Sequence, residues 1–284
     1  MQDVLALIGE RYPEMSKGQR RIANAITEDR ERAAYLTAAA LGTLAEVSES
    51  TVVRFATELG FSGYPHFQRA LQELLRSRLT PGERIDAMDH RVGNADPLSK
   101  VMASDIERIK YTMEHIDRTA FSEAVSALLE ADNIYLYGAR SASMLSGFLG
   151  MNLGLIFDNV KNLQPTSASE VFEQLLPIGP RDVLVAISFP RYSQKMVKAV
   201  RYAHDRGARV IALTDAPTSP IAAGATYLLT AQSDMAAFAD SLVAPLSIVN
   251  AIITEITRRR SGEIKARFAR MEQLWDEYDV YAKP

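Results

Sequence analysis

The side chains best suited to chemistry fall into two groups, one in the first sixty residues and one after residue 137. The first group lies in Leu44–Phe55, where hydroxyls, a carboxylate and a guanidinium surround an apolar stripe. Val52, Phe55 and Leu59 recur at helical spacing and predict the buried face of a helix. Ser48 stands where the N-cap of that helix belongs. Polar residues are then left exposed at the front of the helix: Ser48, Glu49, Ser50, Thr51 and Arg54.

This arrangement is typical of a helix-turn-helix, which presents the first residues of its second helix to base edges in the DNA major groove. Hydroxyls can contact phosphates or bases, and an arginine can bond a guanine through two hydrogen bonds. The alternative interpretation is a solvated face of a small helical bundle.

The second group follows a set of short apolar runs that alternate with helical stretches. This pattern predicts a parallel sheet covered on both faces, with strands in Asn133–Tyr137, Asp182–Ile187, Ala208–Leu213 and Thr226–Leu229. Ligands bind such sheets outside the carboxyl ends of the strands. The loops that begin at Gly138, Ser188 and Thr214 are therefore the candidate binding loops.

The elements that must position these groups divide the chain in two. We predict an all-α helix-turn-helix bundle at 1–79, a linker at 80–97, an α/β domain with a parallel sheet at 98–260 and a helical tail at 261–284. In the first part Ser16 and Gln19 match a capping box, and Gly60 supplies a helix stop. Thr80–Glu83 is a turn signal. Helices are expected at about 37–45, 49–59, 66–78, 98–115 and 237–260.

Composition limits the remaining function classes. The 284 residues carry a formal net charge of −3, and residues 1–79 contain ten basic and ten acidic side chains, so any DNA contact must come from a local patch. The chain has no cysteine, no metal-ligand spacing among its four histidines and no dinucleotide fingerprint, so we predict no cofactor. No apolar run is long enough to span a bilayer and no signal peptide is recognisable, which favours the cytoplasm and no membrane partner.

The residues around the predicted helix-turn-helix carry a resemblance. The sequence resembles the N-terminal domain of the RpiR/MurR family of bacterial regulators in three segments, Val47-Ser48, Thr51–Phe55 and Leu59–Phe67. Members of that family join this domain to a sugar isomerase (SIS) domain. The resemblance implies DNA binding and a three-layer α/β second domain. Tyr64 and His66, at the next helix start, could then reach backbone phosphates, although His66 reads equally well as an exposed loop histidine. This chain has Gly42 and Glu46 where the family usually has Ala and often has Gly.

In SIS domains two loops hold a phosphorylated sugar at helix N-termini, where the helix dipole favours an anion. The first loop tends to read Gly-x-Gly-x-Ser, and here it is Gly138–Ala142 with Ser143 next. The second usually reads Ser-x-Ser-Gly-x-Thr, and here it is Ser188–Ser193. In each loop an arginine, Arg140 or Arg191, has replaced a glycine.

We therefore expect an anionic effector, a sugar phosphate or a carboxylate, bound by these two loops and the next strand end. The predicted ligands are Gly138, Arg140, Ser141, Ser143, Ser188, Arg191, Ser193 and Asp215. The alternative is that the two arginines make structural ion pairs, within the chain or across a dimer interface. Asp215 also fits a turn-capping role.

The resemblance further implies a homodimer or a dimer of dimers bound to operator DNA. The rival class is a SIS-type sugar-phosphate isomerase, which needs a general base at the sugar. The carboxylates near the predicted loops stand in no catalytic pattern: Asp158, Glu170, Glu173, Asp215 and Asp240. A ligand sensor without specific DNA binding is a third reading. Trp275, Leu274 and Tyr278, in the tail, are expected to pack on the core or on a partner.

Overall fold

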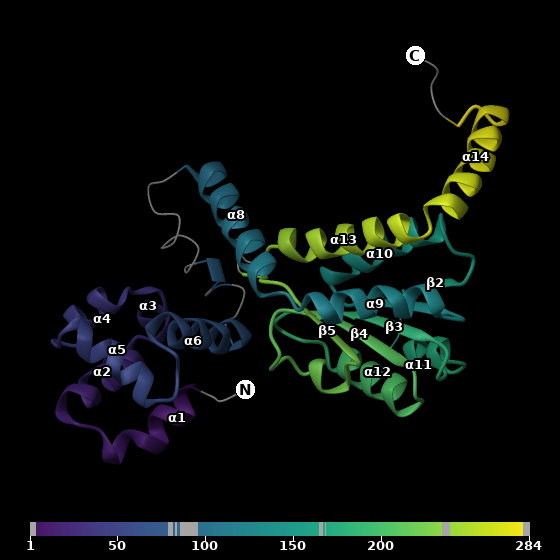
Figure 1. The fold of residues 1–284 in the computed structure, drawn as a ribbon. Helices are drawn as coiled ribbons and strands as arrows, with labels where there is room; N and C mark the ends of the chain where they lie inside the picture. Colours follow the sequence, from purple (N-terminus) through teal and green to yellow (C-terminus); the bar gives the residue numbers. More distant parts are fainter. Residues whose placement is uncertain are drawn as a thin grey trace. The chain divides into compact units, whose positions relative to one another are not determined.

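The structure is a computed structural model that describes residues 4–78, 82, 84–85, 96–164, 167, 169–234 and 239–280 (Figure 1). The chain forms two compact units, one of residues 1–94 and 237–239 and the other of residues 95–236 and 240–284. The linker expected at 80–97 falls mostly outside the described residues, so its limits stay a prediction.

The first unit is a bundle of α-helices. Ser16 caps α2 as predicted, since its Oγ accepts from the Gln19 amide and the Gln19 side chain accepts from the Ser16 amide at 2.7 Å. Gly60 ends α5 with a φ of +94°. The helices are α1 Val4–Arg11, α2 Lys17–Glu28, α3 Arg30–Tyr35, α4 Ala38–Leu44, α5 Glu49–Glu58 and α6 Tyr64–Arg78, with a 3-10 turn at Tyr12–Glu14.

The core of this unit contains the apolar stripe predicted for α5. Val52, Phe55 and Leu59 are buried. Phe55 meets Phe67 of α6 edge to face, with 5.7 Å between ring centroids. Phe61 meets the same ring at 5.4 Å. The aromatic residues after α5 therefore fix how α6 packs against it.

The second unit is built on a five-stranded sheet, all parallel, in the order β2-β1-β3-β4-β5. The four predicted strands are present, and β2 is an addition. The strands are β1 Ile134–Gly138, β2 Val160–Asn162, β3 Val183–Ile187, β4 Arg209–Thr214 and β5 Tyr227–Thr230. The helices are α8 Pro97–His115, α9 Arg118–Glu130, α10 Ala142–Gly154, α11 Glu170–Leu175, α12 Gln194–Asp205, α13 Val243–Arg259 and α14 Ser261–Glu277, with a 3-10 turn at Ala222–Gly224.

Helices cover both faces of this sheet, which confirms the predicted three-layer fold. Alternate strand residues point to opposite sides. Leu136 and Val185 join a core with α9, α10 and α13, whereas Tyr135 and Leu184 join a core with α11 and α12. In Figure 1 α13 and α12 accordingly lie on opposite sides of the strands.

Two details at the C-terminal end differ from the sequence expectation. The helix expected from Ala237 begins at Val243. In α14 Ile264 is the buried residue, while Leu274 and Tyr278 are exposed and Trp275 meets Phe268 at 6.4 Å. Leu274 and Tyr278 therefore do not pack on the core of their own chain.

Candidate functional site

The predicted helix-turn-helix is formed by α4, the turn after it and α5. The turn is tight, because the Val47 amide donates to the Gly42 carbonyl at 2.8 Å. A Cβ at Gly42 would lie 2.9 Å from the Val47 carbonyl oxygen, closer than real side chains come, so glycine fits this crossing. Glu46 takes a left-handed backbone with φ +51°, and its side chain pairs with Arg21 at 3.4 Å.

The start of α5 is exposed and rich in hydroxyls. The Ser48 Oγ accepts from the Thr51 amide, which makes Ser48 the N-cap as predicted. It also lies 2.9 Å from the Ser50 hydroxyl and 2.8 Å from the Thr51 hydroxyl. Ser48, Glu49 and Ser50 are exposed, and Thr51 is half-buried. Hydroxyls at a helix N-terminus suit a phosphate or a base edge.

One turn further along α5, Arg54 is exposed, with its Nε 3.6 Å from Glu58 Oε1. Gln19 of α2 also donates to Glu58. Val53, exposed beside Arg54, adds an apolar surface that the sequence reasoning overlooked. The sequence contained a signal for this exposure, because Val53 directly follows Val52, which was predicted to face the core. Contact with a thymine methyl is the chemistry open to such a side chain in the major groove.

The prediction for Tyr64 is wrong in this structure. Tyr64 is buried, and its hydroxyl donates to the Leu36 carbonyl at 2.8 Å, so it cannot reach a phosphate. Burial raises the pKa of Tyr64 to about 12. Gln68 donates to the same carbonyl at 2.7 Å, so the start of α6 is fastened to the α3–α4 junction. His66 is exposed, with Nδ1 3.3 Å from the Ser62 hydroxyl, and its phosphate contact stays a prediction.

In the second unit the three predicted loops lie side by side. Gly138 pairs with Ile187, and Ile187 pairs with Leu213, so the loops after β1, β3 and β4 leave one sheet edge in neighbouring positions. The expected ligand residues are all in these loops or at the first turns of α10 and α12. A Cβ at Gly138 would lie 2.3 Å from the Ala142 carbonyl oxygen, so glycine is needed where β1 meets α10.

The two loop arginines share an unusual backbone. Arg140 has φ +58° and Arg191 has φ +61°, both in the left-handed region that favours glycine. Both side chains are exposed, and among the described residues neither guanidinium is in an ion pair. The structural ion pair within the chain is thus not seen, and one across a dimer interface stays open.

The predicted hydroxyls differ in their local roles. Ser141 is the N-cap of α10 and Ser193 the N-cap of α12, and neither side chain makes a capping hydrogen bond. The Ser143 hydroxyl donates to the Arg140 carbonyl at 2.6 Å and thereby steadies that loop. Ser188 is buried. Two helix N-termini with uncommitted capping hydroxyls, each close to an exposed arginine, form a suitable surface for an anion.

Asp215, after β4, is held from two sides. It accepts from the Tyr192 hydroxyl at 2.7 Å and from the Thr214 hydroxyl at 3.1 Å. Tyr192 therefore joins the second loop to the third. This role was not predicted from the sequence, although a phenol next to Arg191 is a hydrogen-bonding group in a predicted binding loop. Asp215 therefore organises the loops, in keeping with the structural alternative, and its contact with a ligand stays a prediction.

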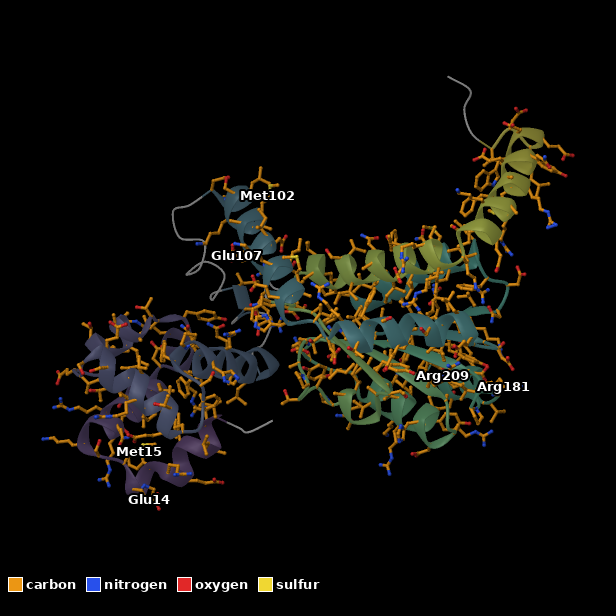
Figure 2. All side chains as sticks on the ribbon, in the orientation of Figure 1. Glu14, Met15, Met102, Glu107, Arg181 and Arg209 are labelled. Atoms are coloured by element: carbon orange, nitrogen blue, oxygen red, sulfur yellow. The ribbon has the colours of Figure 1, made fainter. Side chains whose placement is uncertain are left out.

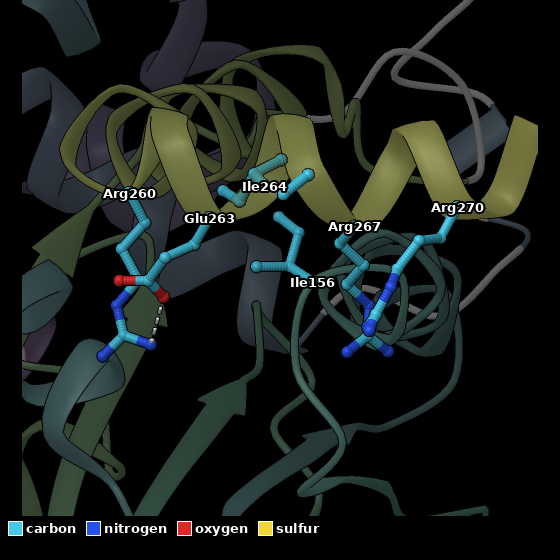
Figure 3. Close-up of a pocket in the computed structure, with 7 residues that line it drawn as sticks. Ile156, Arg260, Glu263, Ile264, Arg267 and Arg270 are labelled. Carbon is cyan, nitrogen blue, oxygen red and sulfur yellow. Dashed lines mark ion pairs between the residues drawn. The ribbon is translucent and has the colours of Figure 1, made fainter.

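A pocket of about 480 Å³ lies near the end of α10 that is farther from the three loops (Figure 3). It is formed where α14 passes the segment between α10 and β2, with Ile156, Ile264 and three arginines in its wall. Arg267 donates to Asp158 at 2.7 Å, which lowers the pKa of that carboxyl, and Arg260 lies 3.6 Å from Glu263. Since α10 begins at the loop edge and ends here, this pocket is separate from the predicted anion site.

The described residues contain neither a membrane-spanning helix nor a metal-binding cluster. None of their helices is long and apolar enough to cross a membrane. No group of three or more His, Asp or Glu side chains is arranged there to hold a metal ion.

Comparison with known proteins matches both units. Residues 2–78 match the family described as "Helix-turn-helix domain, rpiR family", and residues 127–255 match that described as "SIS domain". The HTH-type transcriptional regulator HexR of Pseudomonas aeruginosa is 26% identical over 282 residues, covering 96% of this chain and 95% of that protein.

Two solved structures agree with this assignment. The sugar isomerase domain of an RpiR transcription factor from Sphaerobacter thermophilus is 26% identical, covers 62% of this chain and 97% of its own, and gives a TM-score of 0.59. The Vibrio vulnificus NanR protein complexed with ManNAc-6P is 21% identical, covers 99% and 100%, and gives 0.60, which shows the fold alone. The chain belongs to the RpiR family of helix-turn-helix transcriptional regulators that carry a SIS domain.

Proposed function

We propose that the protein is a DNA-binding transcriptional regulator whose SIS domain senses a small anionic metabolite. The observation that carries the DNA part is the exposed polar start of α5, with Ser48, Glu49, Ser50 and Arg54 on one surface of a family helix-turn-helix. The protein would act as a homodimer or a dimer of dimers on operator DNA in the cytoplasm, because helix-turn-helix proteins read two half-sites about one DNA turn apart.

The anion part rests on the paired arginine loops. A sugar phosphate or a small carboxylic acid would accept from Arg140 and Arg191, with the Ser141 and Ser193 hydroxyls at the two helix N-termini. NanR, of the same fold, is described in complex with a sugar phosphate. Replacement of loop glycines by arginines adds two cations, which widens the effector class to carboxylates.

Fluorescence anisotropy of the full-length protein on DNA from upstream of its own gene tests the DNA part. A specific contact is worth about 1–3 kcal/mol, so Arg54→Ala should weaken specific binding about 5- to 150-fold. Arg201→Ala, an equal loss of charge on an exposed site of the second unit, should leave the affinity unchanged. If the protein binds the upstream DNA and an unrelated duplex with equal affinity, and salt weakens both equally, the protein is a ligand sensor without specific DNA binding.

Calorimetry tests the anion part, with inorganic phosphate, glucose 6-phosphate and citrate as probes. We expect binding of at least one probe to the full-length protein and its loss in Arg191→Ala. If every probe that binds the wild type binds Arg191→Ala equally well, the site is wrong.

We also propose that the SIS domain is not an enzyme. Asp215, the one carboxylate among the predicted ligands, accepts hydrogen bonds from Tyr192 and Thr214, which does not suit a general base at the sugar. NMR of a sugar phosphate incubated with the protein should show no isomer exchange. Exchange above the rate in buffer would support the isomerase instead.

A further inference from the structure

Helix α8, the first helix of the second unit, buries polar residues and exposes apolar ones. Arg108 and Thr112 are its buried residues. Thr112 Oγ1 accepts from the Gln232 amide at 2.9 Å, and Asp105 accepts from the Ser241 hydroxyl at 2.7 Å. Asp105 also pairs with Arg108 at 2.9 Å. Hydrogen bonds, more than apolar burial, therefore connect α8 to the segment between β5 and α13.

The exposed apolar residues of α8 form a regular stripe. Met102 is 59% exposed, Ile106 59%, Ile109 37% and Met113 55%. Their spacing of four, three and four residues is that of the contact positions of paired helices. Figure 2 shows Met102 projecting from α8 away from the sheet. We call these four residues the α8 seam. A soluble helix normally buries such a stripe.

We propose that the α8 seam is the contact surface for α8 of a second copy of this chain, aligned in parallel. The inference rests on the homodimer proposed above and names the surface that forms it. In a parallel pair with this spacing, residues on one side of the seam meet residues five positions later on the other side in the partner helix.

The flanking residues fit that alignment. Asp105, on one side of the seam, comes opposite Lys110 of the second copy. Because Asp105 already pairs with Arg108 and Lys110 with Glu107, this placement of opposite charges fits the alignment without contributing a new strong ion pair. Leu98 comes opposite Ala103, so an apolar side chain meets a small one. Neither contact places like charges together. An antiparallel pair would instead bring Lys110 to Ala103 and Asp105 to Thr112, and would gain no charge pair.

The exposed area is close to what a stable pair needs. Complete burial of Leu, Ile or Met removes roughly 100 Å² of apolar surface, so the seam with its exposed neighbour Leu98 offers about 300 Å² per copy. Interfaces are about 60% apolar, so two copies would bury about 1,000 Å² in total. This matches the lower limit for a biological interface, about 1,000 Å². The pair should therefore dissociate measurably on dilution.

Sedimentation velocity of the full-length chain tests the seam. The wild type should show a dimer that dissociates at low concentration, and Ile106→Glu should weaken it at least 100-fold, because it places two carboxylates in the apolar contact. Since Ile106 is exposed in the single chain, thermal unfolding at a concentration where the wild type is also monomeric should change little. Lys100→Glu, which puts a carboxylate at an exposed position of α8 away from the seam, should leave the dimer intact.

The outcomes separate the seam from the homodimer. A monomeric wild type overturns both. A dimer that survives Ile106→Glu overturns the seam alone, and the exposed apolar residues of α10, Met144, Phe148 and Met151, then become the surface to test.

Crosslinking tests the alignment, because the chain contains no cysteine of its own. In a parallel pair the two copies of position 102 face each other, so Met102→Cys should form an intermolecular disulfide under mild oxidation. Lys100→Cys, at an exposed position away from the seam, should not form this disulfide. If Met102→Cys gives no more crosslink than Lys100→Cys, the parallel pair is wrong.

Discussion

Replacing Arg191 by glycine should separate the backbone of the second loop from its charge. Arg191 has φ +61°, a conformation that costs an L-residue about 1–2 kcal/mol and costs glycine almost nothing. Glycine loses about 0.5–1 kcal/mol more conformational entropy on folding. Arg191→Gly should therefore leave the free energy of unfolding unchanged or raise it by about 1 kcal/mol.

Alanine is the matched comparison, because it removes the guanidinium and keeps the strained backbone. Arg191→Ala should be less stable than Arg191→Gly by about 1 kcal/mol, which corresponds to roughly 2–4 °C in Tm for a unit of this size. Both variants should lose affinity for a bound anion by about 10- to 150-fold, since a hydrogen bond to a charged group contributes about 1.5–3 kcal/mol. Arg140, with φ +58°, should behave in the same way.

Differential scanning calorimetry and titration with inorganic phosphate measure the two effects on the same samples. Glu46→Gly against Glu46→Ala is the control in the first unit, where φ is +51° and no anion effect is expected. If Arg191→Gly melts below Arg191→Ala, the positive φ costs alanine less than glycine loses in conformational entropy, and the backbone argument is refuted. If both variants bind phosphate as the wild type does, the anion site is refuted.

Three further outcomes follow from single contacts. Tyr64→Phe should lower the free energy of unfolding by about 1 kcal/mol and leave the salt dependence of DNA binding unchanged, because its hydroxyl bonds the Leu36 carbonyl; a shallower salt slope at unchanged Tm would restore the phosphate contact. Gly42→Ala should destabilise the first unit in thermal melts despite the better helix propensity of alanine, since its Cβ would lie 2.9 Å from the Val47 carbonyl oxygen; a higher Tm would contradict this. Hydrogen bonds from Arg258 and Arg259 lower the pKa of Glu255 from 4.5 to about 2, so its contribution to stability is present above pH 4.5 and is lost as the pH falls towards 2. Glu255→Gln should flatten that part of the stability–pH curve, and an unchanged curve would show that the pair contributes nothing.

Elements with a local physical signal were predictable from the sequence. The four longer strands are continuous apolar runs, and α2, α4 and α5 begin at side chains that accept their own helix amides: Ser16, Thr37 and Ser48. Strand β2 has three residues with Lys161 at its centre, so it carries no apolar run. Its pairing with β1 is a tertiary contact that no local pattern encodes.

Errors arose where a side chain's partner is distant in sequence. Tyr64 is a polar aromatic beside a predicted DNA-binding helix, and only the fold brings the Leu36 carbonyl, 28 residues away, to its hydroxyl. The hydrogen bond from Tyr192 to Asp215 was likewise not predicted, because the two residues are 23 positions apart; a ligand contact by Asp215 stays a prediction. That α8 buries polar residues and exposes apolar ones was missed for the same reason. The donors that hydrogen-bond to Thr112 and Asp105 of α8 come from residues after β5.

The positions at which this sequence has another residue where the family pattern favours glycine share one backbone feature. At Glu46, Arg140 and Arg191 the family pattern favours glycine, and all three keep a positive φ without it. The fold therefore retains the backbone path that glycine would take and accepts strain to do so. Strain of this kind persists only where the surrounding structure fixes it, and it gathers at functional sites. The Glu46 side chain is paired with Arg21, whereas the loops at Arg140 and Arg191 are held through neighbouring residues and the two guanidinium groups are exposed and in no ion pair among the described residues. A bound anion would supply the ion partner, and this is why the comparison of glycine with alanine at position 191 tests the sensing role more directly than loss of charge alone.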